Sequence, residues 1–300
     1  MTKGFSMLSQ PLMDWQNTGD FFDYQQHRIF YKTSGAGSPL LLIHGFPSAS
    51  WDWQPMWAAL SAKFRLITAD MLGFGLSDKP KYFDYTIAAQ ADLYEMLLSI
   101  QGVETAHILA HDYGDTVAQE LLARHNLGQL SFHIESVTFL NGGLFPETHR
   151  PLLVQKLLMS PVGGWIARLM TKQKLMANFQ RICSSKMTCD DIALLWELLT
   201  HHEGRAVMPK LICYMKERKQ FRSRWVGALQ ETDVPLHLID GLIDPISGAH
   251  LVERFRELVP NGCVSELAGI GHYPQVEAPE EVCQAFQSAL AEAASLSTSK

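Results

Sequence analysis

Short apolar runs alternate with amphipathic stretches along most of the chain. The runs that read as buried strands are Leu40–Ile43, Phe64–Ala69, Ala106–Ala110, Pro235–Ile239 and Cys263–Leu267. The stretches that predict helices are Tyr85–Ile100, Asp115–His125, Gly248–Leu258 and Pro279–Ala293. Strands that alternate with helices in this way are typical of a mainly parallel sheet with helices on both faces. We therefore predict an α/β protein.

One interval departs from this alternation. Between Gly143 and Thr232 the strand-like runs vanish, and the pattern predicts only helices, at Pro151–Met159, Gly163–Met176, Asp190–His201 and Lys210–Arg218. The chain thus divides into a first sheet portion (1–143), an all-helical insertion (144–232) and a second sheet portion (233–300).

The most informative chemical signal lies where the third of these apolar runs meets a helix. Asp112 stands at the centre of Ala110–Gly114, and small residues flank it as they flank the serine of a Gly-x-Ser-x-Gly nucleophile elbow. A carboxylate that attacked an acyl carbon would form an anhydride, so an aspartate here is suited to displacing a leaving group from saturated carbon. The alternative is an aspartate that only caps the next helix.

Two later residues complete a triad in the order nucleophile, acid, histidine. Asp244 lies in the turn after Pro235–Ile239, and His272 lies in a glycine-flanked loop after Cys263–Leu267. Taken singly, Asp244 could be a turn former and His272 a loop hydrogen-bonding residue. Taken jointly with Asp112, at three strand ends, they favour catalysis.

The first apolar run is followed by candidates for an oxyanion hole. Phe46, after Leu40–Ile43, can offer its main-chain NH, and Tyr113, directly after Asp112, can offer another. The glycines of the Asp70–Ser77 loop predict ordinary turns and so bear on the fold alone.

These motifs together resemble a known family. The strings that carry the resemblance are His44–Pro47, Asp70–Ser77, His111–Gly114 and Gly271–His272. They are similar to the epoxide hydrolase and haloalkane dehalogenase branch of the α/β-hydrolase superfamily. Three more strings, Asn141–Pro151, Phe221–Leu229 and His111–Asp115, resemble one group within that branch. The resemblance implies an α/β-hydrolase fold, an aspartate nucleophile, and a helical cap at 144–232 that encloses the substrate.

Residues of the insertion indicate which class of substrate the protein could accept. Opening an epoxide needs an acidic donor, whereas a halide needs only weak NH donors. The resemblance implies two cap tyrosines in epoxide hydrolases; Tyr214 fits one, but Val226 stands in the region of the other. Dehalogenases of this branch place tryptophan and asparagine where Tyr113 and Phe46 stand here. We expect epoxide hydrolysis on a small or medium apolar substrate, with dehalogenation and a catalytically silent binding protein as alternatives.

Several of these residues have simpler interpretations. Tyr214 could instead be an amphipathic residue that packs at the cap interface. The basic run Lys216–Lys219, with Arg222 and Arg224, predicts a solvated helix face, and contact with an anionic substrate or a lipid headgroup is the alternative. Glu147 is a reserve candidate for the triad acid.

Composition bounds these expectations. A chain of 300 residues that is 47% hydrophobic can bury a large core, and a net charge of -6 argues against nucleic acid as a partner. Five scattered cysteines lack metal-ligand spacing, so we expect reduced, mostly buried thiols. Met1–Asp20 lacks the apolar stretch of a signal peptide, and no run could span a membrane. We expect a cytoplasmic enzyme with a small-molecule substrate and no cofactor or metal; its oligomeric state stays open.

Overall fold

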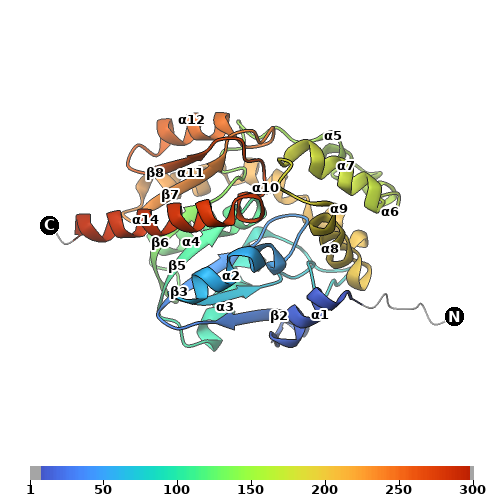
Figure 1. The fold of residues 1–300 in the computed structure, drawn as a ribbon, viewed down its shortest axis with the longest axis horizontal. Coiled ribbons are helices and arrows are strands. Elements are labelled where there is room, and N and C mark those ends of the chain that lie inside the picture. Colours follow the sequence, from blue (N-terminus) through green and yellow to red (C-terminus); the bar gives the residue numbers. More distant parts are fainter. Residues whose placement is uncertain (1–7, 298–300) are drawn as a thin grey trace.

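An eight-stranded sheet forms the centre of the molecule (Figure 1). The computed structural model describes residues 8–297. The strand order is β1-β2-β4-β3-β5-β6-β7-β8, and β3 to β8 run parallel while β1 and β2 form an antiparallel edge. The strands are β1 (Asp20–Tyr24), β2 (His27–Ser34), β3 (Ser38–Ile43), β4 (Phe64–Ala69), β5 (Thr105–Ala110), β6 (His133–Phe139), β7 (Leu236–Gly241) and β8 (Cys263–Leu267). The predicted mainly parallel sheet is confirmed.

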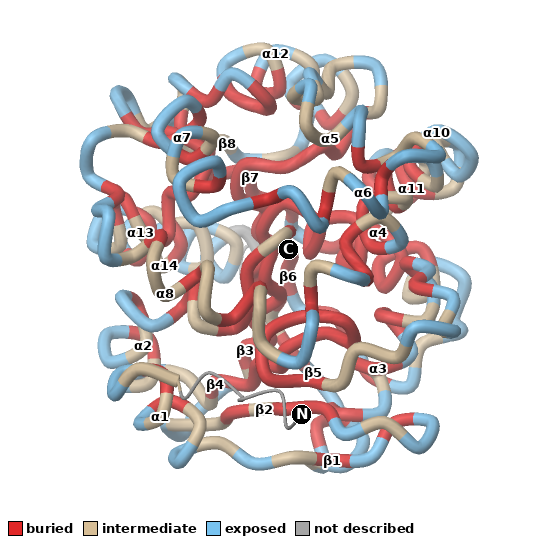
Figure 2. The backbone as a smooth tube through the Cα atoms, turned by 90° about the vertical axis from the view of Figure 1, so that its right-hand side faces the viewer, coloured by how far each residue is buried: buried red, intermediate tan, exposed pale blue. Residues whose placement is uncertain are grey.

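The sheet buries apolar side chains on both faces because successive residues of a strand point in opposite directions. In β3, Leu40 and Leu42 pack with α2 and α14, whereas Leu41 and Ile43 belong to the larger core on the side of α3 and α4. The helices outside the insertion are α1 (Gln10–Asn17), η1 (Ser50–Trp53), α2 (Gln54–Ser61), α3 (Ile87–Ile100), α4 (Tyr113–Asn126), α12 (Ala249–Leu258), α13 (Pro274–Glu277) and α14 (Pro279–Ser297). Figure 2 shows the buried backbone running through the central strands, with exposed residues on the outer helices.

Only helices lie between β6 and β7. They are α5 (Leu153–Leu158), α6 (Gly163–Arg168), α7 (Lys172–Ile182), α8 (Cys189–Thr200), η2 (His201–Ala206), α9 (Met208–Leu211), α10 (Tyr214–Gln220) and α11 (Arg222–Glu231). The last of them, α11, returns to pack on α4 beside the sheet. The all-helical character predicted for this interval is confirmed, whereas its division from the core at 144 and 232 stays a prediction.

Two predicted helices of the insertion are wrong in their extent. The helix expected over 163–176 is split into α6 and α7, because Thr171 adopts an extended conformation and its hydroxyl accepts a hydrogen bond from the main-chain NH of Lys174. The helix expected over 210–218 is likewise divided between α9 and α10. The helix expected over 190–201 corresponds to α8, and Thr188 caps its start: the main-chain NH of Thr188 donates to the Asp191 carboxylate, and the main-chain NH of Asp191 donates to the Thr188 hydroxyl.

All five cysteines are free thiols. Cys183 and Cys283 are buried, but Cys189 and Cys263 are exposed, so the expectation of mostly buried thiols is wrong. Both exposed cysteines are the first residues of their elements, α8 and β8, where the chain is still at the surface. Within residues 8–297, no helix is both long enough and apolar enough to cross a membrane.

Candidate active site

Asp112 lies in a strained turn between β5 and α4. Its φ of 47° and ψ of −102° are rarely adopted by residues with a side chain. Gly114 permits the turn, because a Cβ there would lie 2.4 Å from the main-chain oxygen of Ile43. Asp112 is only 3% exposed. This is the strand-to-helix geometry that an elbow requires, and it presents the carboxylate above the carboxyl end of β5.

The two oxygens of the Asp112 carboxylate have different surroundings. Oδ2 accepts a hydrogen bond of 3.1 Å from the main-chain NH of Phe46, as expected for an oxyanion-hole donor. Oδ1 faces the helical insertion, where the Tyr214 hydroxyl donates to it at 3.4 Å. Among the described residues, the main-chain NH of Tyr113 makes no hydrogen bond to this carboxylate. One oxygen is therefore held by the core and the other is turned toward α10.

Asp244 and His272 meet as the triad order predicts. The Nδ1 atom of His272 lies 2.7 Å from Oδ2 of Asp244. Asp244 is itself fixed by the main-chain NH groups of Ile246 and Ser247 and by the Ser247 hydroxyl. Because Asp244 contacts Nδ1, this bond places the proton on Nδ1 and leaves Nε2 free to exchange one.

Two buried residues that the sequence did not single out support this pair. Asn141 follows Leu140 at the end of β6, and its amide nitrogen donates to Oδ2 of Asp244 at 3.3 Å. The same nitrogen donates to the main-chain oxygen of Gly241, and Oδ1 of Asn141 accepts from the main-chain NH of Gly241. His111 lies 2.8 Å from the main-chain oxygen of His272 through its Nε2 atom. Burial and the nearby His272 lower the pKa of His111 to about 3, so it is a neutral donor at pH 7.

Opposite charges keep the site ionised despite its burial. Burial would raise the pKa of Asp112, but His272 and Arg218 hold it below its usual range. Burial would lower the pKa of His272, but the carboxylates of Asp244 and Asp112 raise it to about 9. The pKa of Asp244 is in turn lowered, because His272 outweighs the effect of burial. The resting site thus holds charged carboxylates and an imidazolium among buried residues.

Tyr214 and Arg218 both reach the site from α10. Their spacing of four residues places them on one face of the helix, and the Arg218 guanidinium lies 4.4 Å from the centre of the Tyr214 ring. Its Nη2 atom donates to the main-chain oxygen of Asp112 at 2.8 Å and lies 3.8 Å from Oδ1. The prediction of a solvated face is therefore wrong for Arg218, which is 2% exposed, although Lys216 and Lys219 are exposed.

Aromatic residues line the remainder of the site. The Tyr113 ring packs 4.6 Å from that of Tyr214, and the Phe46 ring lies 6.4 Å from it, measured between centres. Burial and the Asp112 carboxylate raise the pKa of Tyr214, so its hydroxyl stays protonated and can donate. Glu147, the reserve acid, lies at the surface in ion pairs with Arg222 and Arg254, and it has no contact with His272.

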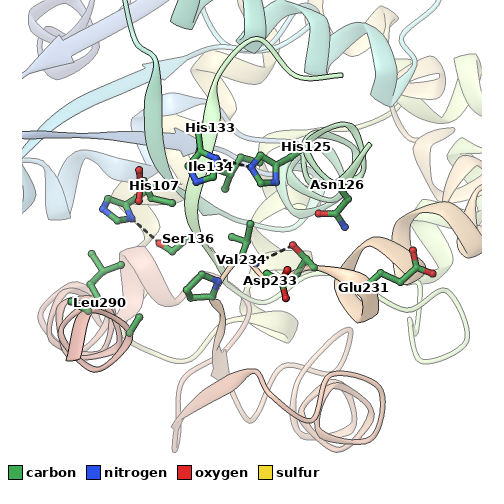
Figure 3. Close-up of a pocket in the computed structure, with 15 residues that line it drawn as sticks. His107, His125, Asn126, His133, Ile134, Ser136, Glu231, Asp233, Val234 and Leu290 are labelled. Carbon is green, nitrogen blue, oxygen red and sulfur yellow. Dashed lines mark hydrogen bonds between the residues drawn. The ribbon is translucent and has the colours of Figure 1, made fainter. Parts of the chain in front are cut away.

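A cavity lies at the opposite end of the sheet. It has a volume of about 660 Å³ and is bordered by the amino ends of β6 and β7 and by α14. Figure 3 shows His107 beside Ser136 and His125 beside His133 in this cavity. Because β3 to β8 are parallel, the cavity lies a full strand length from Asp112. In residues 8–297, no group of three or more His, Cys, Asp or Glu side chains could hold a metal ion.

Fold, turn geometry and sequence comparison lead to one class of protein. The sequence model of the alpha/beta hydrolase fold family matches residues 38–165. The chain belongs to the α/β-hydrolase fold family and is a hydrolase of that family.

Three known proteins illustrate what the chain is similar to. The chain is 41% identical to the mesoderm-specific transcript protein of Mus musculus, over 93% of this chain and 88% of that protein. It is 35% identical to the putative hydrolase LipZ of Mycobacterium tuberculosis, over 95% of this chain and 99% of that protein. The structure of a haloalkane dehalogenase DbeA-M1 loop variant from Bradyrhizobium elkanii is similar, with a TM-score of 0.76, 18% identity, and coverage of 93% and 98%. The three strings that resemble one group, Asn141–Pro151, Phe221–Leu229 and His111–Asp115, are similar to the mesoderm-specific transcript protein.

Proposed function

We propose that this hydrolase opens an epoxide through a covalent ester on Asp112. The observation that carries the proposal is the Asp112 carboxylate, which is buried, ionised and held in a strained elbow. The core donates a hydrogen bond to Oδ2, and Oδ1 faces the helical insertion. A buried, charged carboxylate that faces a tyrosine hydroxyl and aromatic rings suits attack on an uncharged electrophile. The helical insertion 144–232 acts as the cap over this site.

In the first step Oδ1 of Asp112 attacks a ring carbon of the epoxide. The carbon–oxygen bond breaks, its electron pair stays on the epoxide oxygen, and Tyr214 supplies the proton that this oxygen needs. Tyr214 is suited to the task because its hydroxyl already points at Oδ1, where the reacting carbon must lie. The product of the step is a hydroxyalkyl ester on Asp112.

In the second step His272 removes a proton from water, and the water attacks the Asp112 carbonyl carbon. The developing charge on Oδ2 is stabilised by the main-chain NH group of Phe46, which already donates to this oxygen. Esterification prepares the base, because the Asp112 charge helps to raise the pKa of His272 and the ester no longer carries that charge. The imidazolium therefore releases its proton to solvent, and Tyr214 regains from solvent the proton that it gave to the epoxide oxygen. When the ester breaks, the departing alcohol oxygen takes the proton that His272 removed from water. Asp244 keeps the imidazole ring oriented throughout.

Two alternatives stay open to the same test. Dehalogenation would use the same nucleophile, but the hydroxyl and guanidinium that face Oδ1 are stronger donors than a halide requires. A silent binding protein would have no need of a strained residue and several buried charges, each of which costs stability.

Trapping of the ester tests the proposal. His272→Gln protein, incubated with a panel of epoxides, bromoalkanes and esters, should gain the mass of one substrate on the peptide that contains Asp112. The native protein should turn over without a lasting adduct. His133→Gln, a histidine change in the distant cavity, serves as the matched control and should behave like the native protein. If no protein reacts with any epoxide or bromoalkane, the covalent mechanism is wrong and the silent fold is the better account.

A further inference from the structure

The outer surface of the helical insertion concentrates exposed apolar side chains. Five large hydrophobic residues between 153 and 169 have exposed fractions from 37% to 72%. Because α5 packs against α6, these residues belong to one part of the surface. Single exposed apolar residues are ordinary, whereas a group of them marks an interaction site. The five residues are Leu153, Leu157, Val162, Trp165 and Leu169.

Helix α6 is apolar on two faces. Ala167, and Met170 just beyond the helix, are buried in the main core. Val162, Trp165 and Leu169 are spaced by three and four residues, so they share another face, and that face is exposed. A helix that is apolar on more than one side normally has both sides covered. The exposed face of α6 therefore calls for a partner.

The same part of the chain is positively charged throughout. Residues 148–189 contain seven Lys or Arg and no Asp or Glu, whereas the whole chain has 25 Lys or Arg against 31 Asp or Glu. In the part of the chain that the structure describes, only Lys186 of these seven forms an ion pair with a carboxylate, that of Glu281. An acidic protein thus concentrates uncompensated positive charge on one segment. All seven residues are exposed: Arg150, Lys156, Arg168, Lys172, Lys174, Arg181 and Lys186.

Positive groups lie directly beside the apolar ones. The Arg168 guanidinium lies 5.7 Å from the centre of the Trp165 ring, and the Lys174 ammonium donates to the main-chain oxygen of Leu169 at 3.1 Å. Figure 1 shows α5, α6 and α7 together at the edge of the molecule. Leucine and tryptophan flanked by Lys and Arg are typical of helices that lie in the interface of an anionic membrane.

We propose that the surface formed by α5, α6 and the start of α7 docks on a membrane that carries anionic lipids. Its apolar side chains enter the headgroup region, and its lysines and arginines contact lipid phosphates. A second copy of this chain fits poorly, because a symmetric contact would place the positive charges against one another. The docking does not depend on the reaction proposed for Asp112.

Sedimentation of the native chain with lipid vesicles tests the docking surface. Vesicles of phosphatidylcholine with about 30% phosphatidylserine should bind the protein at least ~10-fold more tightly than vesicles of phosphatidylcholine alone. Raising the salt concentration from ~0.1 M to ~0.5 M should release much of the bound protein, because the charges are screened.

Charge reversal assigns the binding to this surface. The test variant combines Lys156→Glu, Arg168→Glu and Lys172→Glu. It should weaken binding by at least ~100-fold, because each Lys or Arg near an anionic surface contributes roughly 5-fold. The control variant makes the same change in net charge and should weaken binding by less than ~5-fold. It reverses three exposed lysines of α9 and α10, in Lys210→Glu, Lys216→Glu and Lys219→Glu.

Tryptophan fluorescence tests whether the apolar face enters the bilayer. Bromine on the lipid acyl chains quenches a tryptophan that lies in the interface, so Trp165→Phe should remove most of the quenching. Trp196→Phe is the matched control, because Trp196 is a half-buried tryptophan on α8 of the same insertion, and it should leave the quenching unchanged.

Several results would overturn the docking. These are no binding to anionic vesicles, equal losses in the two charge variants, or unchanged quenching in Trp165→Phe. Binding of soluble polyglutamate without vesicle binding would instead indicate an acidic protein partner. A dimer in solution that Trp165→Ser dissociates, again without vesicle binding, would indicate a second copy. None of these measurements depends on turnover, so they leave the ester on Asp112 to its own test.

Discussion

The two ends of the parallel strands both hold histidine and hydroxyl or carboxyl side chains, but they differ in charge and in strain. At the amino end His107 lies 2.8 Å from the Ser136 hydroxyl, and His237 lies 2.9 Å from that of Ser265. At the carboxyl end His272 bonds to the buried Asp244 and lies near the strained Asp112.

The difference shows in the pKa values of the histidines. Burial lowers the pKa of His237 to about 4, whereas the facing carboxylates raise the pKa of His272 to about 9. Neither histidine–serine pair at the amino end has a hydrogen bond from the ring to a carboxylate among the described residues. A base needs a group that orients it, so catalysis is not expected in the cavity at the amino end. Buried charge and backbone strain distinguish the carboxyl end as the place where chemistry is expected.

The largest expected effect contrasts the two ends directly. Asp112→Asn should lower kcat/KM by at least ~10⁴-fold, because the nucleophile is lost. Ser136→Ala, which removes the hydroxyl beside His107, should change kcat/KM by less than about 2-fold. Steady-state kinetics on a substrate identified from the panel gives both values. Loss of activity in Ser136→Ala would contradict the conclusion that only the carboxyl end takes part in catalysis.

The pH dependence of stability should have opposite signs for His272 at the carboxyl end and His237 at the amino end. The folded pKa of His272 is raised from 6.5 to about 9, so its stabilisation is present below pH 6.5 and is lost as pH rises toward 9; the full change is about 3 kcal/mol. The folded pKa of His237 is lowered to about 4, so its destabilisation is relieved as pH rises from 4 to 6.5.

Denaturant unfolding from pH 4 to 9 measures both slopes. His272→Gln should flatten the decline in the free energy of unfolding above pH 6.5, and His237→Gln should flatten the rise below it. The pKa of Lys79 is lowered to about 8, so above pH 8 this residue makes the free energy of unfolding rise with pH and offsets the decline caused by His272. The interval from pH 6.5 to 8 is therefore decisive, and an unchanged slope there in His272→Gln would contradict the assigned charge state.

A smaller effect is expected at the cap-facing side of the nucleophile. Tyr214→Phe should lower the rate of epoxide alkylation by roughly 100-fold, because a general acid is lost, while bromoalkane turnover should fall far less. Tyr85→Phe is the matched control, since its hydroxyl bonds to Pro80 away from the site. Stopped-flow measurement of the first turnover separates the steps; equal small losses on both substrates would mean that Tyr214 only packs.

The sequence predicts the central sheet and the elbow well because both depend on local patterns. Apolar runs of strand length and a small-residue turn around Asp112 are visible within a few residues of sequence. The antiparallel edge strand β1 is harder to see, because its residues alternate between exposed and buried over only five positions. The split at Thr171 reflects a local cap that competes with a longer helical pattern.

The cap-facing part of the site could be predicted only in part. Arg218 lies in a run of charges, and such runs are normally solvated, so its burial depends on α10 packing over Asp112. Its position four residues after Tyr214 was the available signal, since it places both side chains on one helix face.

The covalent ester on Asp112 is the central claim, and isotope labelling tests it most directly. One turnover of native protein in H₂¹⁸O, with enzyme in excess over an epoxide substrate, should place the label in Asp112, because water attacks the aspartyl carbonyl carbon. Mass spectrometry of the Asp112 peptide reads the result. A labelled peptide with unlabelled diol is the predicted outcome; an unlabelled peptide with labelled diol would show that water attacks the substrate directly, and would contradict the account.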